Sequence, residues 1–290
     1  MSFQKRLSSG EFTILAQMNT PKGVNISEMV NNARRIKERV HAVVVPDMDN
    51  GVMRMSALAG GVLMRQQGLE PIIHVYGRDR NRMALQGDIL AAWALGIENL
   101  VVVSAENMDN GDHRDAKPVD DLDPVMLLET IRGLTQGVDL AGFDLNGAPS
   151  FTTGCTLAAC DGDRETADEL ALARRKIAAG AQFVILPPVF DVDRAAPFIN
   201  AAKGLGVPVI ASVFLIKSVG IARYMAINEP GAYISEDLIR RIRKASDREA
   251  ECLKIAGETI AALRGQVNGV KIETLGWEHR LPAILDYAGL

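Results

Sequence analysis

The chain has 290 residues, 48% of them hydrophobic, and a formal net charge of −4 from 32 basic and 36 acidic side chains. This length suits one large α/β domain or two small ones, and the mild acidity gives no reason to expect nucleic acid or a membrane surface as a partner. No apolar run approaches about 18 residues, and Met1–Gly10 is polar, so neither a membrane span nor a secretion signal is predicted.

Short apolar runs alternate with helical segments along the first half of the chain. Strands are predicted at Phe12–Gln17, Ala42–Val45, Pro71–Tyr76 and Leu100–Val103. Helices are predicted at Ser27–Arg39, Val52–Gln67, Arg80–Leu95 and Asp123–Thr135. Asp79 and Asp123 are the expected N-caps of the last two helices, and Gly68 and Gly96 the expected ends of the second and third.

The second half repeats this rhythm. Strands are predicted at Phe151–Leu157, Phe183–Leu186, Val207–Leu215 and Val270–Leu275, the second of them broken by Pro187-Pro188. Helices are predicted at Thr166–Ala179, Asp191–Leu205 and Trp277–Tyr287, and a long helical region, interrupted at Glu229-Pro230-Gly231, resumes over Ser235–Arg264.

Eight strands alternating with about eight helices indicate parallel βαβ units. Eight such units in 290 residues favour a closed (β/α)8 TIM barrel over an open sheet. No Gly-rich phosphate fingerprint follows the first strand, which argues against a dinucleotide-binding doubly wound fold. We therefore predict a single domain, an α/β TIM barrel over residues 1–290.

In such a barrel the carboxyl ends of the strands meet at one mouth, where the chemistry is expected. A long polar segment follows the fourth strand, and its Glu106 is the carboxylate best placed to act as an acid or base. Gln17 can only orient or hydrogen-bond a substrate, because an amide carries no titratable proton. His74 and Arg78 are candidate contacts for a cofactor's phosphate or carboxylate groups.

Metal and thiol chemistry receive little support. The four histidines are scattered and show no HxH or HExxH spacing, so no metal site is predicted. Cys155 ends a strand, but no triad pattern accompanies it. Three cysteines without a CxxC pair suit a reducing cytoplasm, which is the expected location.

Several segments resemble the methylenetetrahydrofolate reductase family, especially its short form from anaerobic and acetogenic bacteria. They are Pro21–Gly23, Val52–Ala59, Arg78–Asp88, Gly111–Asp123, Lys176–Phe183, Val189–Asp191, Leu215–Met225 and Val267–Leu290. The resemblance implies a (β/α)8 barrel, a flavin (FAD or FMN), and hydride transfer to 5,10-methylenetetrahydrofolate to give 5-methyltetrahydrofolate. It also implies a folate-type substrate and a partner reductase subunit, and we expect self-association, as in many barrels.

The departures from the family pattern lie at strand ends. Gln17 stands where the family has a general-acid Glu, and Ala105-Glu106 where it has Gly-Asp near the flavin and pterin. Pro46 replaces a flavin-contacting Thr, Ala158-Ala159 an Asn-Pro or His-Pro pair, and Leu186-Pro187 a Thr-Gln whose Gln contacts folate. His74, Lys176, Asp191 and Lys217 keep the family residue types.

The predicted site follows from the strand ends and the resemblance together. Glu106 and Gln17 are assigned to catalysis and to substrate binding, where Asp191 and Lys217 join them. The assigned cofactor contacts are His74, Arg78, Asp47, Lys176 and Asn107. Two alternatives remain open: a family member acting on another pterin or one-carbon substrate without flavin, by methyl transfer, or a non-catalytic subunit of a reductase complex.

Overall fold

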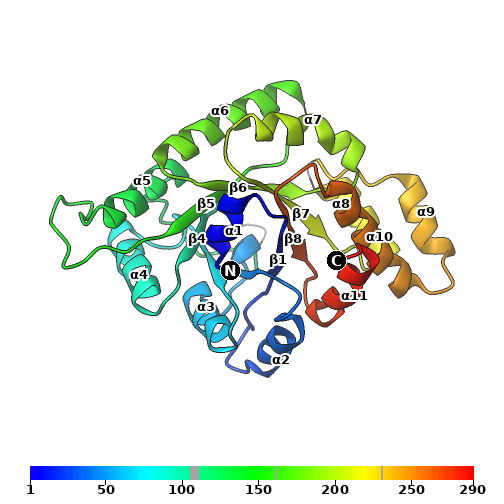
Figure 1. Ribbon diagram of the computed structural model, residues 1–290, viewed down its shortest axis with the longest axis horizontal. Helices are drawn as coiled ribbons and strands as arrows, with labels where there is room; N and C mark the ends of the chain where they lie inside the picture. Colours follow the sequence, from blue (N-terminus) through cyan, green and yellow to red (C-terminus); the bar gives the residue numbers. More distant parts are fainter. Residues whose placement is uncertain (105–110, 161, 230) are drawn as a thin grey trace.

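The computed structural model describes residues 1–104, 111–160, 162–229 and 231–290. Within these residues eight parallel strands close into a barrel in the order β1 to β8, with helices around its outside (Figure 1). The strands are β1 (Thr13–Gln17), β2 (Ala42–Val45), β3 (Pro71–Val75), β4 (Asn99–Val102), β5 (Thr152–Thr156), β6 (Phe183–Pro188), β7 (Val209–Phe214) and β8 (Gly269–Glu273). The predicted single-domain (β/α)8 barrel is confirmed.

The helices that cover the barrel largely follow the apolar periodicity of the sequence. They are α1 (Phe3–Ser9), α2 (Ser27–Ile36), α3 (Ala57–Gln66), α4 (Arg82–Ala94), α5 (Pro124–Thr135), α6 (Asp163–Ala179), α7 (Val192–Lys203), α8 (Val219–Asn228), α9 (Glu236–Lys244), α10 (Arg248–Leu263) and α11 (Leu281–Tyr287). Two 3₁₀ turns, η1 (Asp49–Gly51) and η3 (Glu278–Arg280), follow β2 and β8. None of the helices in the described ranges has the length and apolarity to cross a bilayer.

Several predicted helix boundaries were wrong, and three of these errors have clear local reasons. The helix predicted from Val52 begins at Ala57, because Ser56 caps it and the preceding residues form the loop after β2. Asn81, and not Asp79, caps α4, since its Oδ1 accepts from the backbone N–H groups of residues 83 and 84. The helix predicted over Ser235–Arg264 is divided into α9 and α10, because Asp247 caps a new helix.

The sixth strand does not end before its two prolines, as predicted, but runs through them. β6 extends to Pro188, and its pairing with β7 shifts register between Leu186 and Pro188. A proline has no N–H to give to a neighbouring strand, so a local irregularity lets the strand continue without that bond.

The polar N-terminal segment, for which no element was predicted, forms α1 at the amino end of the barrel. Phe3 and Leu7 are buried in the cluster of inward-facing side chains from the strands, and the Phe3 ring meets Phe183 edge-on at 5.2 Å. The Phe3 N–H donates to Glu70 Oε2, 2.9 Å away, immediately before β3 begins. In Figure 1, α1 lies in the middle of the ring of strands. It therefore closes one end of the barrel, and the opposite, carboxyl end is the one left for a site.

Candidate active site

The seam between β1 and β8 carries a polar cluster of three side chains. Leu15 pairs with Lys271 across this seam and faces the barrel interior, so Gln17, two residues further on, faces the same way. Lys271 Nζ donates to Gln17 Oε1 at 3.2 Å and pairs with Glu273 Oε1 at 2.9 Å. The side chains of Lys271 and Glu273 are only 8% and 14% exposed. Because this ion pair is shielded from solvent, water screens it much less than it screens a surface pair.

Lys271 was missed by the sequence-based assignment. The signal available was the alternation Val270-Lys271-Ile272-Glu273, which puts a lysine and a glutamate on one face of a strand whose other face is apolar. Gln17 lies at the predicted position, and its Nε2 donates to Asn19 Oδ1 at 3.3 Å.

A second cluster joins β3 to the loop after β2. His74 Nδ1 lies 3.3 Å from Asp49 Oδ1, and the Tyr76 hydroxyl donates to the same oxygen. Burial opposes ionisation of Asp49, but the charge and hydrogen bond of His74, the hydrogen bond of Tyr76 and the charge of Lys271 outweigh it and hold the pKa of Asp49 below its usual value. His74 Nε2 is buried and has no hydrogen-bond partner among the described residues.

The loop that carries Asp49 is held in an unusual backbone conformation. Met48 and Asn50 have φ of 56° and 57°, in the left-handed region that side chains with a Cβ rarely adopt. Such strain persists only where the surroundings determine the conformation, and it is concentrated at functional sites. Here it sets the Asp49 carboxylate against His74 and Tyr76.

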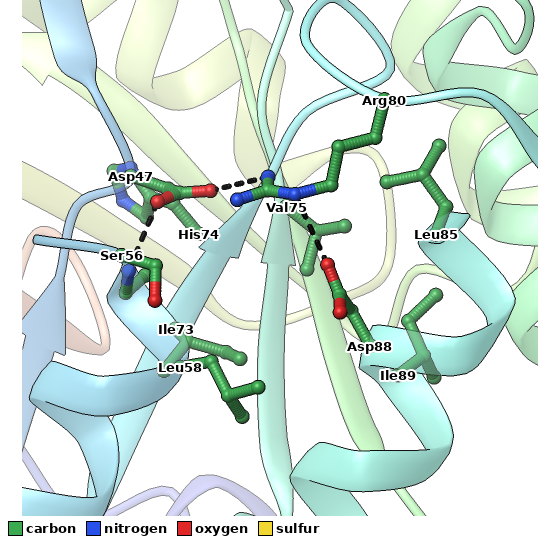
Figure 2. Close-up of a pocket in the computed structure, with 11 residues that line it drawn as sticks. Asp47, Ser56, Leu58, Ile73, His74, Val75, Arg80, Leu85, Asp88 and Ile89 are labelled. Carbon is green, nitrogen blue, oxygen red and sulfur yellow. Dashed lines mark hydrogen bonds and ion pairs between the residues drawn. The ribbon is translucent and has the colours of Figure 1, made fainter. Parts of the chain in front are cut away.

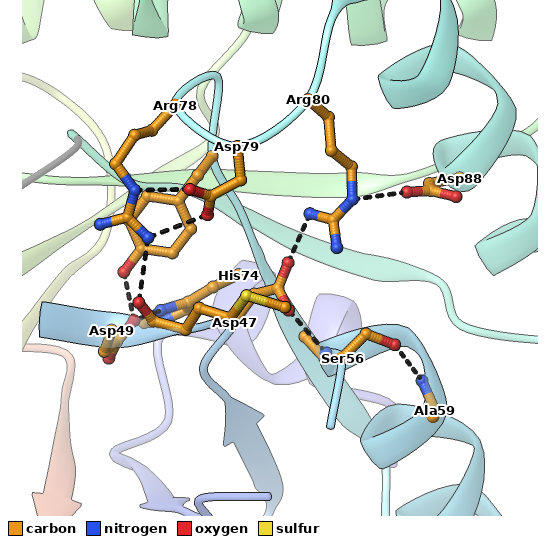
Figure 3. Close-up of polar contacts among 12 residues, drawn as sticks. Asp47, Asp49, Ser56, Ala59, His74, Arg78, Asp79, Arg80 and Asp88 are labelled. Atoms are coloured by element: carbon orange, nitrogen blue, oxygen red, sulfur yellow. Dashed lines mark hydrogen bonds and ion pairs between the residues drawn. The ribbon is translucent and has the colours of Figure 1, made fainter. Parts of the chain in front are cut away.

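Two arginines and three carboxylates hold the ends of β2 and β3 together (Figure 3). Arg78, 2% exposed, makes a two-pronged contact with Asp79 at 2.7 and 2.9 Å and donates to the Met48 carbonyl at 3.0 Å. Asp47 accepts from Arg80 Nη1 at 2.6 Å, and Arg80 Nε pairs with Asp88 at 3.0 Å. The predicted cofactor contacts Asp47 and Arg78 are thus engaged in holding the loops of the mouth.

A cavity of about 290 Å³ lies beneath this network, between α3, α4 and β3 (Figure 2). Ile73 and Val75, which belong to the outer core between strands and helices, line it together with Leu58 and Ile89. The Asp47–Arg80–Asp88 chain crosses its polar edge. The cavity is therefore a space in the helix–strand layer next to the mouth, and its charged groups are already paired with one another.

Lys176 links α6 to the ends of β4 and β5. Its side chain is 1% exposed, and its Nζ donates to the Thr156 carbonyl at 2.9 Å and to Ser104 Oγ at 3.4 Å. Glu169 lies 3.5 Å from the same nitrogen. Cys155, on β5, is buried, and this burial raises the pKa of its thiol to about 12, which leaves it unsuited to act as a nucleophile.

Two further predicted residues, Asp191 and Lys217, have contacts of their own. Asp191 caps α7 by accepting from the Arg194 N–H at 3.1 Å. Lys217 donates to the Leu275 carbonyl and lies 5.3 Å from the centre of the Trp277 ring; its burial lowers its pKa, which Glu278 partly opposes. Glu106 and Asn107 lie outside the described residues, so their predicted roles remain predictions.

The described part of the segment between β4 and α5 crosses three other strand ends. Asp112 pairs with Lys22 after β1 and accepts from the Met53 N–H after β2, at 3.0 Å. The Val119 N–H then donates to the Arg78 carbonyl after β3, at 2.7 Å. This segment therefore covers the β1–β3 side of the mouth. Among the described residues, no group of three or more His, Cys, Asp or Glu side chains is arranged to hold a metal ion.

Comparison with known proteins gives one match to a sequence family. The family profile described as "Methylenetetrahydrofolate reductase" matches residues 2–289, and the resemblance inferred from the motifs is thereby confirmed. No curated protein matches the chain significantly in sequence.

Solved structures share the fold at low sequence identity. An F420-dependent secondary alcohol dehydrogenase bound to an F420-acetone adduct aligns at 12% identity with a TM-score of 0.57, covering 94% of this chain and 99% of that one. The 2,3-dimethylmalate lyase, of the PEP mutase/isocitrate lyase superfamily, aligns at 10% identity and 0.53, covering 99% and 84%. Tryptophan synthase from M. tuberculosis aligns at 13% and 0.52, covering 98% and 91%. At such identities these likenesses establish the barrel fold alone.

Proposed function

The chain belongs to the methylenetetrahydrofolate reductase family, whose members are folate one-carbon enzymes, and on that premise we propose that it reduces 5,10-methylenetetrahydrofolate to 5-methyltetrahydrofolate with a bound flavin. The observation that carries the proposal is the environment of the His74 side chain. This residue keeps the family's flavin-contacting type, sits at the mouth of the barrel, and has a buried ring nitrogen without a partner among the described residues.

Contacts on this side of the mouth support the proposed binding of a flavin. Leaving a buried polar atom unbonded costs about 1–3 kcal/mol, which a hydrogen bond from a ligand would offset. Asp49 holds His74 Nδ1, so Nε2 is the nitrogen left for FAD or FMN. Lys176 supplies a buried positive charge at the ends of β4 and β5, and Asp47 and Arg78 fix the loops around them. When bound, the reduced flavin supplies the hydride; the protein positions both partners.

The folate would occupy the β1 and β6–β8 side of the same mouth. Gln17 would orient the pterin by hydrogen bonds, and Asp191 and Lys217, which keep the family residue types, would lie along the rest of the substrate. Residues at the carboxyl ends of the strands would then hold both the flavin and the folate. Barrel enzymes position their reactants in this way.

The visible spectrum of the purified protein tests the proposal directly. We expect flavin bands, present on purification or gained on addition of FAD or FMN, that are bleached by a reductant and restored by methylenetetrahydrofolate without oxygen. His74→Leu should weaken flavin binding relative to His74→Gln, which keeps a polar group. A colourless protein that takes up neither flavin would contradict the proposal.

A second prediction concerns Glu106, assigned to catalysis from the sequence. If this carboxylate is the essential acid, Glu106→Gln should lower turnover by about 10²–10⁴ while flavin binding is retained. The measurement is the rate of flavin reoxidation by methylenetetrahydrofolate, with Glu98→Gln, whose carboxylate precedes β4, as the matched control. Near-normal turnover of Glu106→Gln would remove this residue from the mechanism.

A specific observation favours a second candidate function. At three strand ends the family's polar residues are replaced by side chains without a polar group, namely Pro46, Ala158 and Pro187. These changes suit a family member that binds another pterin or one-carbon substrate and transfers a methyl group without flavin, or a non-catalytic subunit of a reductase complex. Folate binding by a colourless protein would support the first alternative, and activity of the isolated chain would exclude the second. All three cysteines are unpaired thiols, which suits the reducing cytoplasm expected for each candidate.

A further inference from the structure

We propose that Lys271 is the proton donor of the reaction, acting at the β1–β8 seam where Gln17 offers only an amide. This inference rests on the proposed function, because it assigns a chemical step of that same site. It starts from an arrangement that has no evident structural purpose: a lysine placed inside the barrel mouth, where an apolar residue would pack more simply.

The contacts of Lys271 present its ammonium at the substrate side of the barrel. The opposite end is closed by α1, whose Phe3 and Leu7 fill the interior. Lys271 Nζ reaches Gln17 Oε1, at the carboxyl end of β1, and Glu273 Oε1, at the carboxyl end of β8. An ammonium has three N–H donors, and these two contacts occupy two of them. Among the described residues no contact of the third is recorded, and it can donate to an acceptor atom of a ligand in the mouth.

The proposed reaction needs a proton at one defined atom. Methylenetetrahydrofolate carries its one-carbon unit between two nitrogens of an imidazolidine ring. Without a proton, the departing nitrogen would leave as an anion, which is a poor leaving group. Transfer of a proton from Lys271 Nζ to the departing nitrogen lets the carbon–nitrogen bond break, with its electron pair remaining on that nitrogen. The other nitrogen forms an iminium with the one-carbon unit, which accepts the hydride supplied by the reduced flavin. Lys271 is left as a neutral amine and regains its proton from water.

The other ionisable side chains of the described mouth are less suited to this step. Asp49 is held ionised by its neighbours, and arginines do not release a proton. Lys176 and Lys217 direct their amino groups to the backbone carbonyls of Thr156 and Leu275. Glu273 Oε1 lies 2.9 Å from Lys271 Nζ, so this carboxylate is engaged with the ammonium and not directed at a ligand.

The test distinguishes three possible roles of Lys271: proton transfer, electrostatic stabilisation and a contribution to folding. The measured rate is that of flavin reoxidation by methylenetetrahydrofolate, after reduction by dithionite. Lys271→Met should lower it by about 10²–10⁴, and Lys271→Arg, which keeps the charge but cannot donate its proton, should be similarly slow. Lys271→Met/Glu273→Gln removes the pair together, so a buried carboxylate is not left alone. Lys203→Met, on the exposed end of α7, is the control and should react like the wild type.

Rescue gives the sharpest readout. Gln17→Glu introduces a carboxyl group at the position that contacts Lys271. The double variant Gln17→Glu/Lys271→Met should therefore react at least tenfold faster than Lys271→Met. Binding of 5-methyltetrahydrofolate, followed by tryptophan fluorescence, should match the wild type in Lys203→Met, and in Lys271→Met and Lys271→Arg it should weaken far less than the rate falls. If Lys271 had only a structural role, Lys271→Arg would keep the rate and Gln17→Glu would not restore it.

The outcomes distinguish this inference from the proposed function. A wild-type protein that binds flavin and is reoxidised by methylenetetrahydrofolate, together with a Lys271→Met variant of similar rate, overturns the assignment of Lys271 alone. A fast Lys271→Arg variant shows an electrostatic role and also overturns it. A Glu106→Gln variant that loses the rate while Lys271→Met keeps it assigns the proton to Glu106. A wild-type protein that is never reoxidised overturns both proposals.

Discussion

Side chains at the mouth of this barrel fall into two groups according to how completely their polar atoms are satisfied. Arg78 and Asp47 make short contacts with neighbouring loops, and such contacts hold a site in shape. Among the described residues, His74 Nε2 is buried without a partner, and Lys271 uses two of its three N–H donors. Atoms of the second kind are the ones able to recognise a ligand, since binding then restores a hydrogen bond that folding left unmade.

The three cysteines should differ in reactivity. Burial raises the pKa of Cys155 to about 12 and that of Cys252 to about 11, whereas Cys160 is only half-buried. Iodoacetamide at about pH 8 should therefore modify Cys160 first in the native protein, because the thiolate is the reacting form. Peptide mass spectrometry measures the modification at each site, and urea-unfolded protein is the control in which all three react. Equal labelling of Cys155 and Cys160 in the native state would contradict the burial of β5.

Asp121 should make stability depend on pH in acid. Its contacts with Arg82, both side chain to side chain and from the Arg82 N–H, lower its pKa from 3.8 to about 2. A carboxyl whose pKa falls on folding contributes stability that is present above about pH 4 and is lost as the pH falls towards about 2. The urea midpoint of the wild type should exceed that of Asp121→Asn at about pH 5 and approach it at about pH 2.5. Because the pair is exposed, high salt should shrink the difference; a difference that grows in acid would contradict the assignment.

At the scale of elements, the short helix α1 closes one end of the barrel. Seven residues are too few for a helix that is stable alone, so α1 depends on packing Phe3 and Leu7 into the barrel. The loops at the other end behave differently: the loop after β2 adopts left-handed φ angles, and the segment after β4 crosses to β1, β2 and β3. One end of the barrel is thus closed by apolar packing, and the other is built from polar contacts between loops.

Removing the Phe3 ring should destabilise the whole barrel. Phe3→Ala deletes a buried aromatic side chain that contacts Phe183, and such deletions cost about 3–5 kcal/mol of the free energy of unfolding. Urea unfolding followed by circular dichroism measures the change. Lys5→Ala, on the exposed face of the same helix, is the matched control and should change the free energy by less than about 0.5 kcal/mol. Equal effects of the two substitutions would mean that α1 is not docked.

At the scale of the molecule, closure of the barrel ties the two halves of the chain together. β1 pairs with both β2 and β8, so no strand among the eight has a free edge. The β1–β8 contact that completes the ring also carries Gln17 and Lys271, so the proposed proton donor exists only when the barrel is closed. Stability of the fold and assembly of the site are therefore linked at this seam.

This linkage predicts that distant parts of the barrel unfold together. Trp93 lies on α4, against Phe151, and Trp277 follows β8, so the two tryptophans report on different sectors. The variants Trp93→Phe and Trp277→Phe each leave one reporter, and we expect the same urea midpoint for the change in fluorescence of both. Circular dichroism of each variant controls for a shift caused by the substitution itself. Separate midpoints for the two reporters would show that part of the barrel opens independently.

The sequence by itself determined the architecture and the family. Apolar runs of strand length, separated by helices with recognisable caps and glycine ends, repeat eight times, and this local pattern specifies parallel βαβ units that close into a barrel. It also placed Gln17 and His74 at strand ends on the mouth, because a residue's position along a strand fixes which end of the barrel it occupies.

Only the tertiary structure decided which polar groups remain available. The pairing of Lys271 with Gln17 joins residues 254 positions apart, and the contact of Asp49 with His74 and Tyr76 depends on a strained turn that no local pattern announces. The docking of α1 was likewise invisible, because a short, mostly polar segment gains its helix from two apolar side chains buried elsewhere in the fold. Strand and helix formation are governed by neighbours in sequence, whereas hydrogen-bond partners at the mouth are set by the register of strands that meet only when the ring closes.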